Sequence, residues 1–121
     1  MANKNRQNGY VRLINAVKYS LKGLMAVWKN EVAFRQETVV TVIGTAATMV
    51  LDCTAVERVL LIGSLILIMI FEIINSGIET IIDYLESNQH PLAGQAKDIG
   101  SAAVFMAILL ALLTWISVLW L

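Results

Sequence analysis

Hydrophobic and polar positions near the start of the chain alternate with the period of an α-helix. Over residues 10–29, apolar side chains recur every three or four positions and basic side chains occupy the opposite side. The apolar side carries Tyr10, Ile14, Val17, Leu21, Leu24 and Trp28, and the basic side carries Arg12, Lys18, Lys22 and Lys29. Such a helix is suited to lie in a membrane interface, with its cations near anionic headgroups. The same pattern also fits an amphipathic helix packed on a soluble core.

Three apolar blocks follow and predict three membrane-spanning helices. Residues 38–51, 59–71 and 99–121 hold no charged side chain, and the second block continues apolar to residue 82 around a few polar positions. A spanning helix needs about 20 apolar residues, which only the last block supplies by itself. The first two blocks reach that length when neighbouring charged residues enter the membrane zone. We therefore expect a single domain over residues 1–121, with a basic tail and surface helix over 1–29 and transmembrane helices over about 30–51, 56–83 and 98–121.

The connections and the basic residues predict how these helices cross the membrane. Residues 52–57 suffice for a tight turn, and residues 84–98, which hold the only proline, predict a polar loop. Seven of the nine Lys and Arg residues precede the first apolar block. Because basic residues gather on the cytoplasmic side, we expect the N-terminus and the 84–98 loop in the cytoplasm and the C-terminus outside.

The composition agrees with a membrane protein. Apolar residues make up 58% of the chain and charged residues 15%, against about 45–50% and 25% in a soluble domain. Nine basic and nine acidic residues cancel, which argues against a nucleic-acid-binding protein. The first thirty residues hold six cations and no acid, whereas every acid lies between Glu31 and Asp98. One cysteine, Cys53, and one histidine exclude an intramolecular disulfide and a Cys/His zinc site.

Polar residues form a stripe along the second predicted span: Glu72, Asn75, Glu79 and Asp83. Their spacings of three, four and four place them within about 80° of one another on a helix. An ionisable group in the hydrocarbon costs at least about 2.5–3.5 kcal/mol, so such residues usually face an interior or an aqueous cavity and have a function. Packing alone is a poor explanation for two acids within one span, Glu72 and Glu79, and a third, Asp83, at its end.

Further charged residues are expected at the same membrane face. Glu31 and Arg35, spaced i,i+4 before the first apolar block, either join the stripe or form a simple surface ion pair. Lys97 and Asp98 stand at the start of the third span. Carboxylates beside an amide and cations suit Mg²⁺ shared with a substrate phosphate, and a remaining carboxylate could accept a proton from a hydroxyl. Neither common nucleotide-binding loop pattern is present, so these residues indicate only a small polytopic membrane protein with a carboxylate-rich interfacial site.

Three blocks of sequence carry a resemblance to a known family. Residues 72–83 read EIINSGIETIID, residues 30–37 read NEVAFRQE, and residues 96–103 read AKDIGSAA. In their order along the chain, and over nearly its whole length, they resemble the signature segments of the bacterial integral-membrane diacylglycerol kinases. The resemblance implies transfer of the γ-phosphate of Mg-ATP to the hydroxyl of 1,2-diacylglycerol, which gives phosphatidic acid.

The resemblance also implies roles for individual residues. Glu72 would be the general base, and Glu31 and Glu79 would hold Mg²⁺. The implied ATP-binding residues are Tyr19, Glu31, Asn75, Glu79, Asn88, Gln89, His90, Lys97 and Asp98. The implied lipid-substrate-binding residues are Arg12, Ser20, Ala33, Phe34, Arg35, Gln36, Glu37, Arg58, Glu72, Ser101 and Trp115.

At the level of the assembly, the resemblance implies an all-α homotrimeric bundle in the bacterial inner membrane, with active sites shared between subunits. Two other functions stay open. Some relatives phosphorylate undecaprenol instead, and no residue here separates the two lipid hydroxyls on physical grounds. A small oligomeric cation-coupled transporter would also place acids within its membrane spans.

Overall fold

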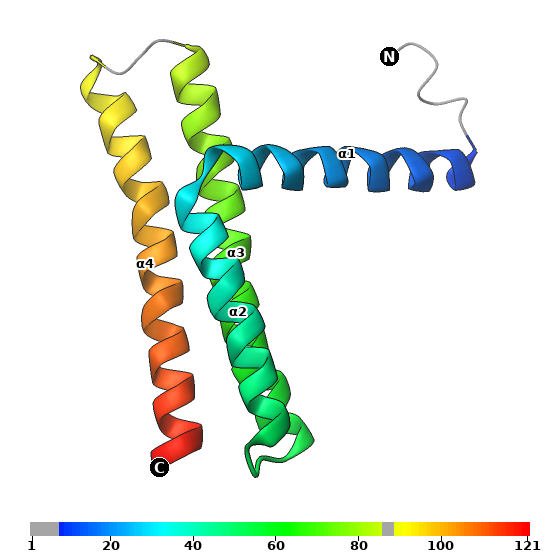
Figure 1. The fold of residues 1–121 in the computed structure, drawn as a ribbon. Helices are drawn as coiled ribbons and strands as arrows, with labels where there is room; N and C mark the ends of the chain where they lie inside the picture. Colours follow the sequence, from blue (N-terminus) through cyan, green and yellow to red (C-terminus); the bar gives the residue numbers. More distant parts are fainter. Residues whose placement is uncertain (1–7, 86–88) are drawn as a thin grey trace.

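The computed structural model describes residues 8–85 and 89–121, which form four α-helices. These are α1 (Gly9–Asn30), α2 (Val32–Val50), α3 (Ala55–Tyr84) and α4 (Pro91–Trp120). The described residues contain no β-strand, which confirms the all-helical prediction. α2 and α4 each pack along α3, and α1 projects crosswise from the start of α2 (Figure 1).

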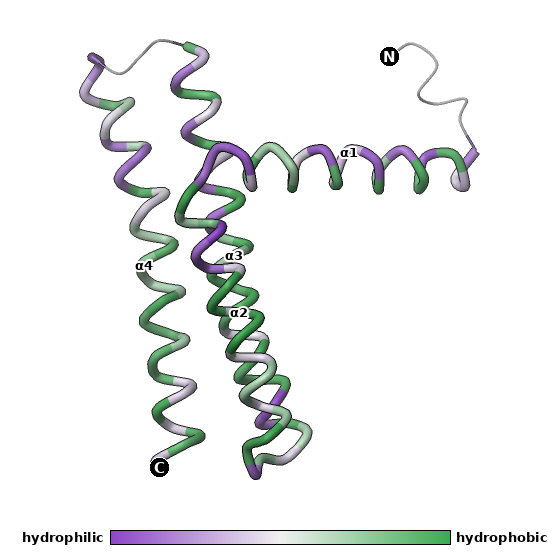
Figure 2. The backbone as a smooth tube through the Cα atoms, in the orientation of Figure 1, coloured by the Kyte–Doolittle hydropathy of each residue, from purple (hydrophilic) through white to green (hydrophobic). Residues whose placement is uncertain are grey.

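The crosswise helix α1 is amphipathic, as predicted. Its hydrophilic residues line one side and its hydrophobic residues line the side towards which the bundle extends (Figure 2). Most of these apolar side chains are exposed, Tyr10 by 74% and Leu13 by 66%. This helix is therefore not packed on a soluble core, and its apolar face is open to an environment outside the chain.

The break between α1 and α2 lies at a single residue, Glu31. Its backbone is extended, with φ −119° and ψ 107°, so it ends α1 and begins α2. The last carbonyls of a helix lack partners within that helix. Arg35 provides a donor for two of these carbonyls: its Nη1 donates to the carbonyl oxygens of Trp28 at 2.6 Å and Lys29 at 3.2 Å. Arg35 therefore fastens α1 across the start of α2 instead of forming the simple surface ion pair considered from its spacing.

The turn between α2 and α3 is as short as the sequence predicts. Thr54 and Glu57 form a capping box, in which the Thr54 hydroxyl accepts from the Glu57 N–H and the Glu57 carboxylate accepts from the Thr54 N–H, both at 3.1 Å. Arg58 donates from Nε to the carbonyl of Thr48 at 3.1 Å. These bonds begin α3 and satisfy a carbonyl in the last turn of α2.

α3 is the central helix of the bundle. The buried core lies between α3 and α4, where Leu65 and Ile68 contact small side chains and Val104 of α4. Two small residues on that helix, Ala107 and Ala111, let it approach closely. On the other side, a Cβ on Gly44 of α2 would meet Leu65 Cδ1 at 2.5 Å, so glycine allows α2 to lie against α3 as well.

The predicted loop over residues 84–98 was wrong in its second half. α4 begins at Pro91, and the imidazole Nδ1 of His90 caps it by accepting from the N–H of Leu92 at 3.1 Å. Proline at the first position of a helix loses no hydrogen bond, because that N–H has no partner within the helix. The proline that indicated a loop therefore starts the helix.

Two of the helices meet the length and composition of membrane spans. These are α3 and α4, each of 30 residues and about 45 Å long, against a hydrocarbon core of about 30 Å. Only 11% of the most apolar stretch of α4 is buried within the chain. Its apolar side chains are therefore exposed, which is typical of side chains that face lipid. α2 has 19 residues and is about 28 Å long, and its own crossing stays a prediction.

Candidate functional site

The polar stripe of α3 runs from a buried to an exposed environment. Glu72 and Asn75 are buried, at 7% and 6% exposure, although both are polar. Glu79 is half-buried one turn later, and Asp83 is exposed near the end of the helix. The stripe thus leads from the interior of the bundle to the surface at the end where α1 branches off (Figure 1).

The extended residue between α1 and α2 reaches this stripe. Glu31 accepts through Oε1 a hydrogen bond from the hydroxyl of Ser76 at 3.1 Å. On the stripe itself, Asn75 donates from Nδ2 to Oε1 of Glu79 at 3.2 Å. The structure therefore places Glu31, which lies between α1 and α2, beside the part of α3 that carries Asn75 and Glu79.

Negative charge is concentrated in this cluster. The carboxylate of Glu72 interacts repulsively with those of Glu31 and Glu79, and that of Glu37 interacts repulsively with Glu72. Like charges so close in a low-dielectric site favour the binding of a cation. The cluster is formed by α2 and α3 at the point where α1 meets them.

The donor set fits a metal that a substrate also binds. In the described ranges, no group of three or more His, Cys, Asp or Glu side chains is placed to hold a metal ion by itself. Mg²⁺ is typically bound through one or two carboxylates together with substrate phosphates and waters. Glu31 and Glu79, each with one oxygen already accepting a hydrogen bond, match that smaller set.

An ion pair joins the outer ends of α3 and α4. Lys97 Nζ lies 2.8 Å from Oδ1 of Asp83, with both side chains partly exposed. Asp83 lies seven residues beyond Ser76, about 10 Å farther along α3, so this pair lies beyond the level of α1. Figure 1 shows the ends of α3 and α4 projecting past α1 in this way. A cation is thus placed at the rim of the carboxylate cluster.

The other residues implied for ATP binding lie on α1 and around the start of α4. Tyr19 lies on α1, twelve residues before Glu31 or about 18 Å along the helix, with the Lys22 Nζ 6.0 Å from its ring centre. Gln89, His90 and Asp98 are exposed. Asn88 lies outside the described residues.

The implied lipid-binding segment over residues 33–37 has a buried and an exposed side. Phe34 is buried and packs edge-on against Trp28, with ring centres 6.5 Å apart. Glu37 has a buried Oε1 without a hydrogen-bond partner among the described residues, whereas Gln36 is exposed. Glu37 thus presents an unsatisfied carboxylate oxygen on the same side as Glu72.

The remaining residues implied for lipid binding are spread over the molecule. Arg12 and Ser20 lie on the exposed surface of α1, and Ser101 is exposed at the level of the cluster. Arg58 lies fourteen residues before Glu72, about 21 Å down α3. Trp115 is at that end too, where its Nε1 donates to the carbonyl of Leu61 at 3.1 Å. Within one chain, Arg58 and Trp115 connect helices and do not reach the cluster.

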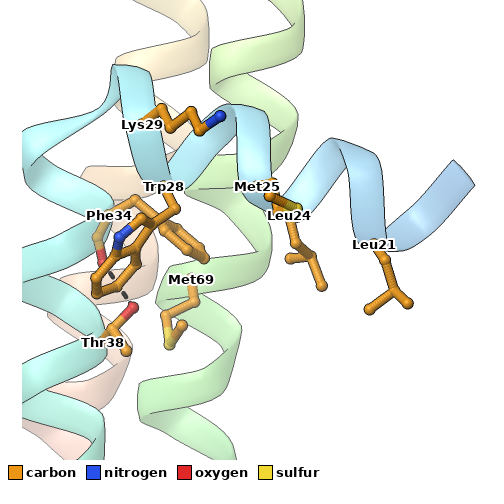
Figure 3. A pocket seen from close by; sticks show the side chains of 8 residues that line it. All are labelled: Leu21, Leu24, Met25, Trp28, Lys29, Phe34, Thr38 and Met69. Atoms are coloured by element: carbon orange, nitrogen blue, oxygen red, sulfur yellow. Dashed lines mark hydrogen bonds between the residues drawn. The ribbon is translucent and has the colours of Figure 1, made fainter. Parts of the chain in front are cut away.

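An apolar pocket opens beneath α1 next to the cluster. Its volume is about 550 Å³, and it is an open pocket lined by the last turns of α1, the start of α2 and one side of α3. Figure 3 shows Trp28, Phe34 and Met69 around it, with Lys29 on the opposite side of α1. Met69 lies one turn before Glu72. The lining residues are Leu21, Leu24, Met25, Trp28, Lys29, Phe34, Thr38 and Met69.

Two residues of the site have no functional role assigned from the sequence. Ser76, which binds Glu31, is four positions after Glu72 and belongs to the same helical stripe, so the spacing could have found it. Gly100 lies against Asn75 across the contact between α3 and α4. Only the packing of two helices brings that pair together, so no sequence spacing indicates it.

Comparisons with known proteins agree with the resemblance seen in the sequence. Residues 18–119 match the family described as prokaryotic diacylglycerol kinase. The chain is similar to a diacylglycerol kinase of Escherichia coli (strain K12), with 50% identity over 116 residues that cover 96% of this chain and 95% of that protein. A diacylglycerol kinase of Haemophilus influenzae is 42% identical over 91% of this chain and 93% of its own length. One of Pseudomonas aeruginosa is 40% identical over 93% of this chain and 92% of its own length.

Proposed function

The chain belongs to the prokaryotic diacylglycerol kinase family and is an ATP-dependent diacylglycerol kinase, and we propose that Glu31, Glu72 and Glu79 form its phosphoryl-transfer site. The reaction joins the γ-phosphate of ATP to the free hydroxyl of 1,2-diacylglycerol and gives phosphatidic acid and ADP. The meeting of Glu31, at the junction of α1 and α2, with the carboxylate stripe of α3 carries this proposal.

Glu72 is proposed as the general base. It is buried on α3 and lies one turn from Met69, which lines the apolar pocket. A carboxylate in this position would accept the proton of the lipid hydroxyl as its oxygen attacks the γ-phosphorus. The apolar lining of the pocket would limit water near that attack and so favour transfer to the lipid over hydrolysis.

Glu31 and Glu79 are proposed as the protein ligands of Mg²⁺. The ion would supply charge neutralisation at the β- and γ-phosphates of ATP. Ser76 holds Glu31 and Asn75 holds Glu79, each through one hydrogen bond. Phosphoryl transfer depends mostly on positioning and electrostatic stabilisation, which are the contributions that these side chains can make.

Nucleotide binding is proposed at the outer end of α3 and α4. Lys97 lies there with Asp83, beyond the level of α1, and its cation suits a triphosphate that arrives from water. Asn75, Asp98, Gln89 and His90, together with Tyr19 and Asn88, complete the proposed set. His90 already caps α4, so its imidazole acts in the structure whether or not it meets the nucleotide.

The acyl chains of diacylglycerol are proposed to enter the pocket beneath α1. Its lining is apolar apart from Lys29 and Thr38, and it opens on the side of α1 that carries the hydrophobic residues. An acyl chain there would place the glycerol hydroxyl near the end of the pocket formed by Phe34 and Met69. Residues 33–37 would then border the headgroup.

We further propose a homotrimer of three-span subunits in the inner membrane, with the N-terminus in the cytoplasm and the C-terminus in the periplasm. α1 would lie in the cytoplasmic interface. Two observations support shared sites. Tyr19 and Arg12 are far from the carboxylates of their own chain, and the apolar faces of α2 and α4 are exposed in a single chain. In a trimer, Tyr19 and Arg12 of one subunit would lie near the carboxylate cluster of its neighbour. The neighbouring subunit would also cover part of the exposed apolar faces of α2 and α4.

The proposed base is tested by Glu72→Gln, which keeps the shape of the side chain and removes its basicity. Purified protein in mixed micelles receives diacylglycerol, Mg²⁺ and ATP labelled at the γ-phosphate, and labelled phosphatidic acid is measured. We expect kcat to fall at least about 100-fold, because general base catalysis contributes about 10²–10⁴-fold.

Glu57→Gln is the matched control, since glutamine also completes a capping box and residue 57 lies at the other end of α3. Retained activity in Glu72→Gln would remove Glu72 as the base.

Undecaprenol in place of diacylglycerol tests the second acceptor. Cation flux into proteoliposomes without ATP turnover would instead favour the transporter.

A further inference from the structure

One glycine of α4 faces the polar stripe of α3. A Cβ on Gly100 would overlap Oδ1 of Asn75 and would lie 3.2 Å from Cγ of Asn75 and 3.7 Å from Cδ1 of Ile78. Gly77 and Gly94 do not share this environment, because a Cβ on either residue would meet nothing within 4 Å. The space at residue 100 is therefore occupied by the Asn75 amide.

The amide of Asn75 is held in one orientation. Its Nδ2 donates to the Glu79 carboxylate, and its Oδ1 is buried with no hydrogen-bond partner in the described part of the chain. The reverse orientation would set the amide oxygen against the carboxylate of Glu79, where two acceptors repel. The oxygen must therefore lie against Gly100, where only a residue without a Cβ leaves room for it.

Helix propensity gives no reason for glycine here. Residue 100 is in the tenth position of a 30-residue helix, where alanine is the better helix former. Nor does the backbone require it, since its φ is not in the left-handed region that favours glycine. What distinguishes the position is the contact with Asn75.

We propose that Gly100 is a positioning residue for phosphoryl transfer: its missing side chain lets the Asn75 amide point its NH₂ at Glu79 and so holds that carboxylate in place. The inference rests on the proposed role of Glu79. Because residue 100 is one turn from Lys97, the same contact sets how closely the start of α4 approaches the stripe of α3. A methyl group at residue 100 displaces the amide from Glu79, from α4, or from both.

The first test compares Gly100→Ala with Gly94→Ala in the full chain in mixed micelles. Both changes add one methyl group to the first half of α4, but only the first meets another side chain. We expect Gly100→Ala to lower kcat/KM for Mg-ATP at least tenfold while KM for diacylglycerol stays within twofold. Gly94→Ala stays within twofold of the unmodified protein in each value. Equal effects of the two variants, or a twofold effect at most in Gly100→Ala, would overturn the proposal.

The second test asks whether Gly100 acts through Asn75 and does not depend on turnover. The side-chain amide ¹⁵N resonance of Asn75, assigned by its loss in Asn75→Ala, should shift in Gly100→Ala and stay unchanged in Gly94→Ala. An unchanged resonance overturns the proposal. Absence of kinase activity in the unmodified protein would sink the proposed function alone, since the resonance still reports the contact.

A double variant covers the case in which Gly100→Ala fails to fold. Asn75→Ala removes the amide that the added methyl group meets. The thermal unfolding midpoint of Asn75→Ala/Gly100→Ala should therefore return to that of Asn75→Ala. If the double variant fails to fold as well, the methyl group collides with something other than Asn75 and the proposal is wrong.

Discussion

Among single residues, the carboxylates of the site depend on neutral neighbours that hold them. Ser76 binds Glu31 across the α2–α3 contact, and Asn75 binds Glu79 along α3. Both donors are buried, so their hydrogen bonds are shielded from water. The two proposed metal ligands are thus positioned before any ion arrives, which lowers the cost of ordering them on binding.

Ser76→Ala removes the hydroxyl that holds Glu31. A hydrogen bond to a charged group contributes about 1.5 kcal/mol or more, so the Mg²⁺ concentration for half-maximal activity should rise about tenfold. KM for diacylglycerol should change little. The measurement is a Mg²⁺ titration of kinase activity at saturating lipid.

Ser76→Thr is the matched variant, since it keeps the hydroxyl. It should recover most of the Mg²⁺ affinity lost in Ser76→Ala. If both variants need the same Mg²⁺ concentration as the unmodified protein, the hydrogen bond to Glu31 has no part in metal binding.

Among the elements, the break at Glu31 decides where the cluster lies. One extended residue turns the chain from α1 into α2, and the carbonyls left at the end of α1 are satisfied by Arg35. The sequence predicted a change of helix near residue 30, but its periodicity contains no signal for the angle. That angle follows from which donors reach the orphan carbonyls.

Arg35→Ala should loosen this junction. It leaves the carbonyls of Trp28 and Lys29 without their side-chain donor, which should lower the free energy of unfolding by about 1–2 kcal/mol. Amide hydrogen exchange should rise in the last turn of α1, and the thermal midpoint in micelles should fall. Lys18→Ala, also a cation removed but from the exposed side of α1, is the control. Equal changes in the two variants would show that Arg35 does not hold the junction.

For the whole molecule, one helix organises the others. α3 carries the stripe, packs on both α2 and α4, and projects past α1 to the pair formed by Asp83 and Lys97. If α1 lies in the interface, the buried part of the stripe is at headgroup depth and its outer end is in water. A lipid hydroxyl and an aqueous nucleotide can then meet at one cluster.

The proposed topology is tested with single cysteines placed in a Cys53→Ser background. Gly9→Cys, Asp52→Cys and Gln89→Cys are exposed positions before α2, between α2 and α3, and between α3 and α4. In intact spheroplasts, a membrane-impermeant maleimide should label only Asp52→Cys, and permeabilisation should expose all three. Labelling of Gly9→Cys together with Asp52→Cys would mean that α2 does not cross the membrane.

Periodicity and composition were sufficient for the helices, the amphipathic character of α1 and the carboxylate stripe, because each depends on neighbours three or four residues apart on one helix. The resemblance of three short blocks supplied the family, and the comparisons agree with it. The start of α4 was missed because Pro91 and Gly94 are read as loop residues, whereas proline is also a favoured first residue of a helix.

The tertiary structure decided which groups meet. The hydrogen bond from Ser76 to Glu31 joins residues 45 positions apart, and the space at Gly100 is filled by a side chain of another helix. Arg58 and Trp115 are separated from the cluster by about half the length of α3, although the family resemblance assigns them to lipid binding together with Glu72. Helical spacing determines which face a residue occupies, but only packing between helices determines what that face touches.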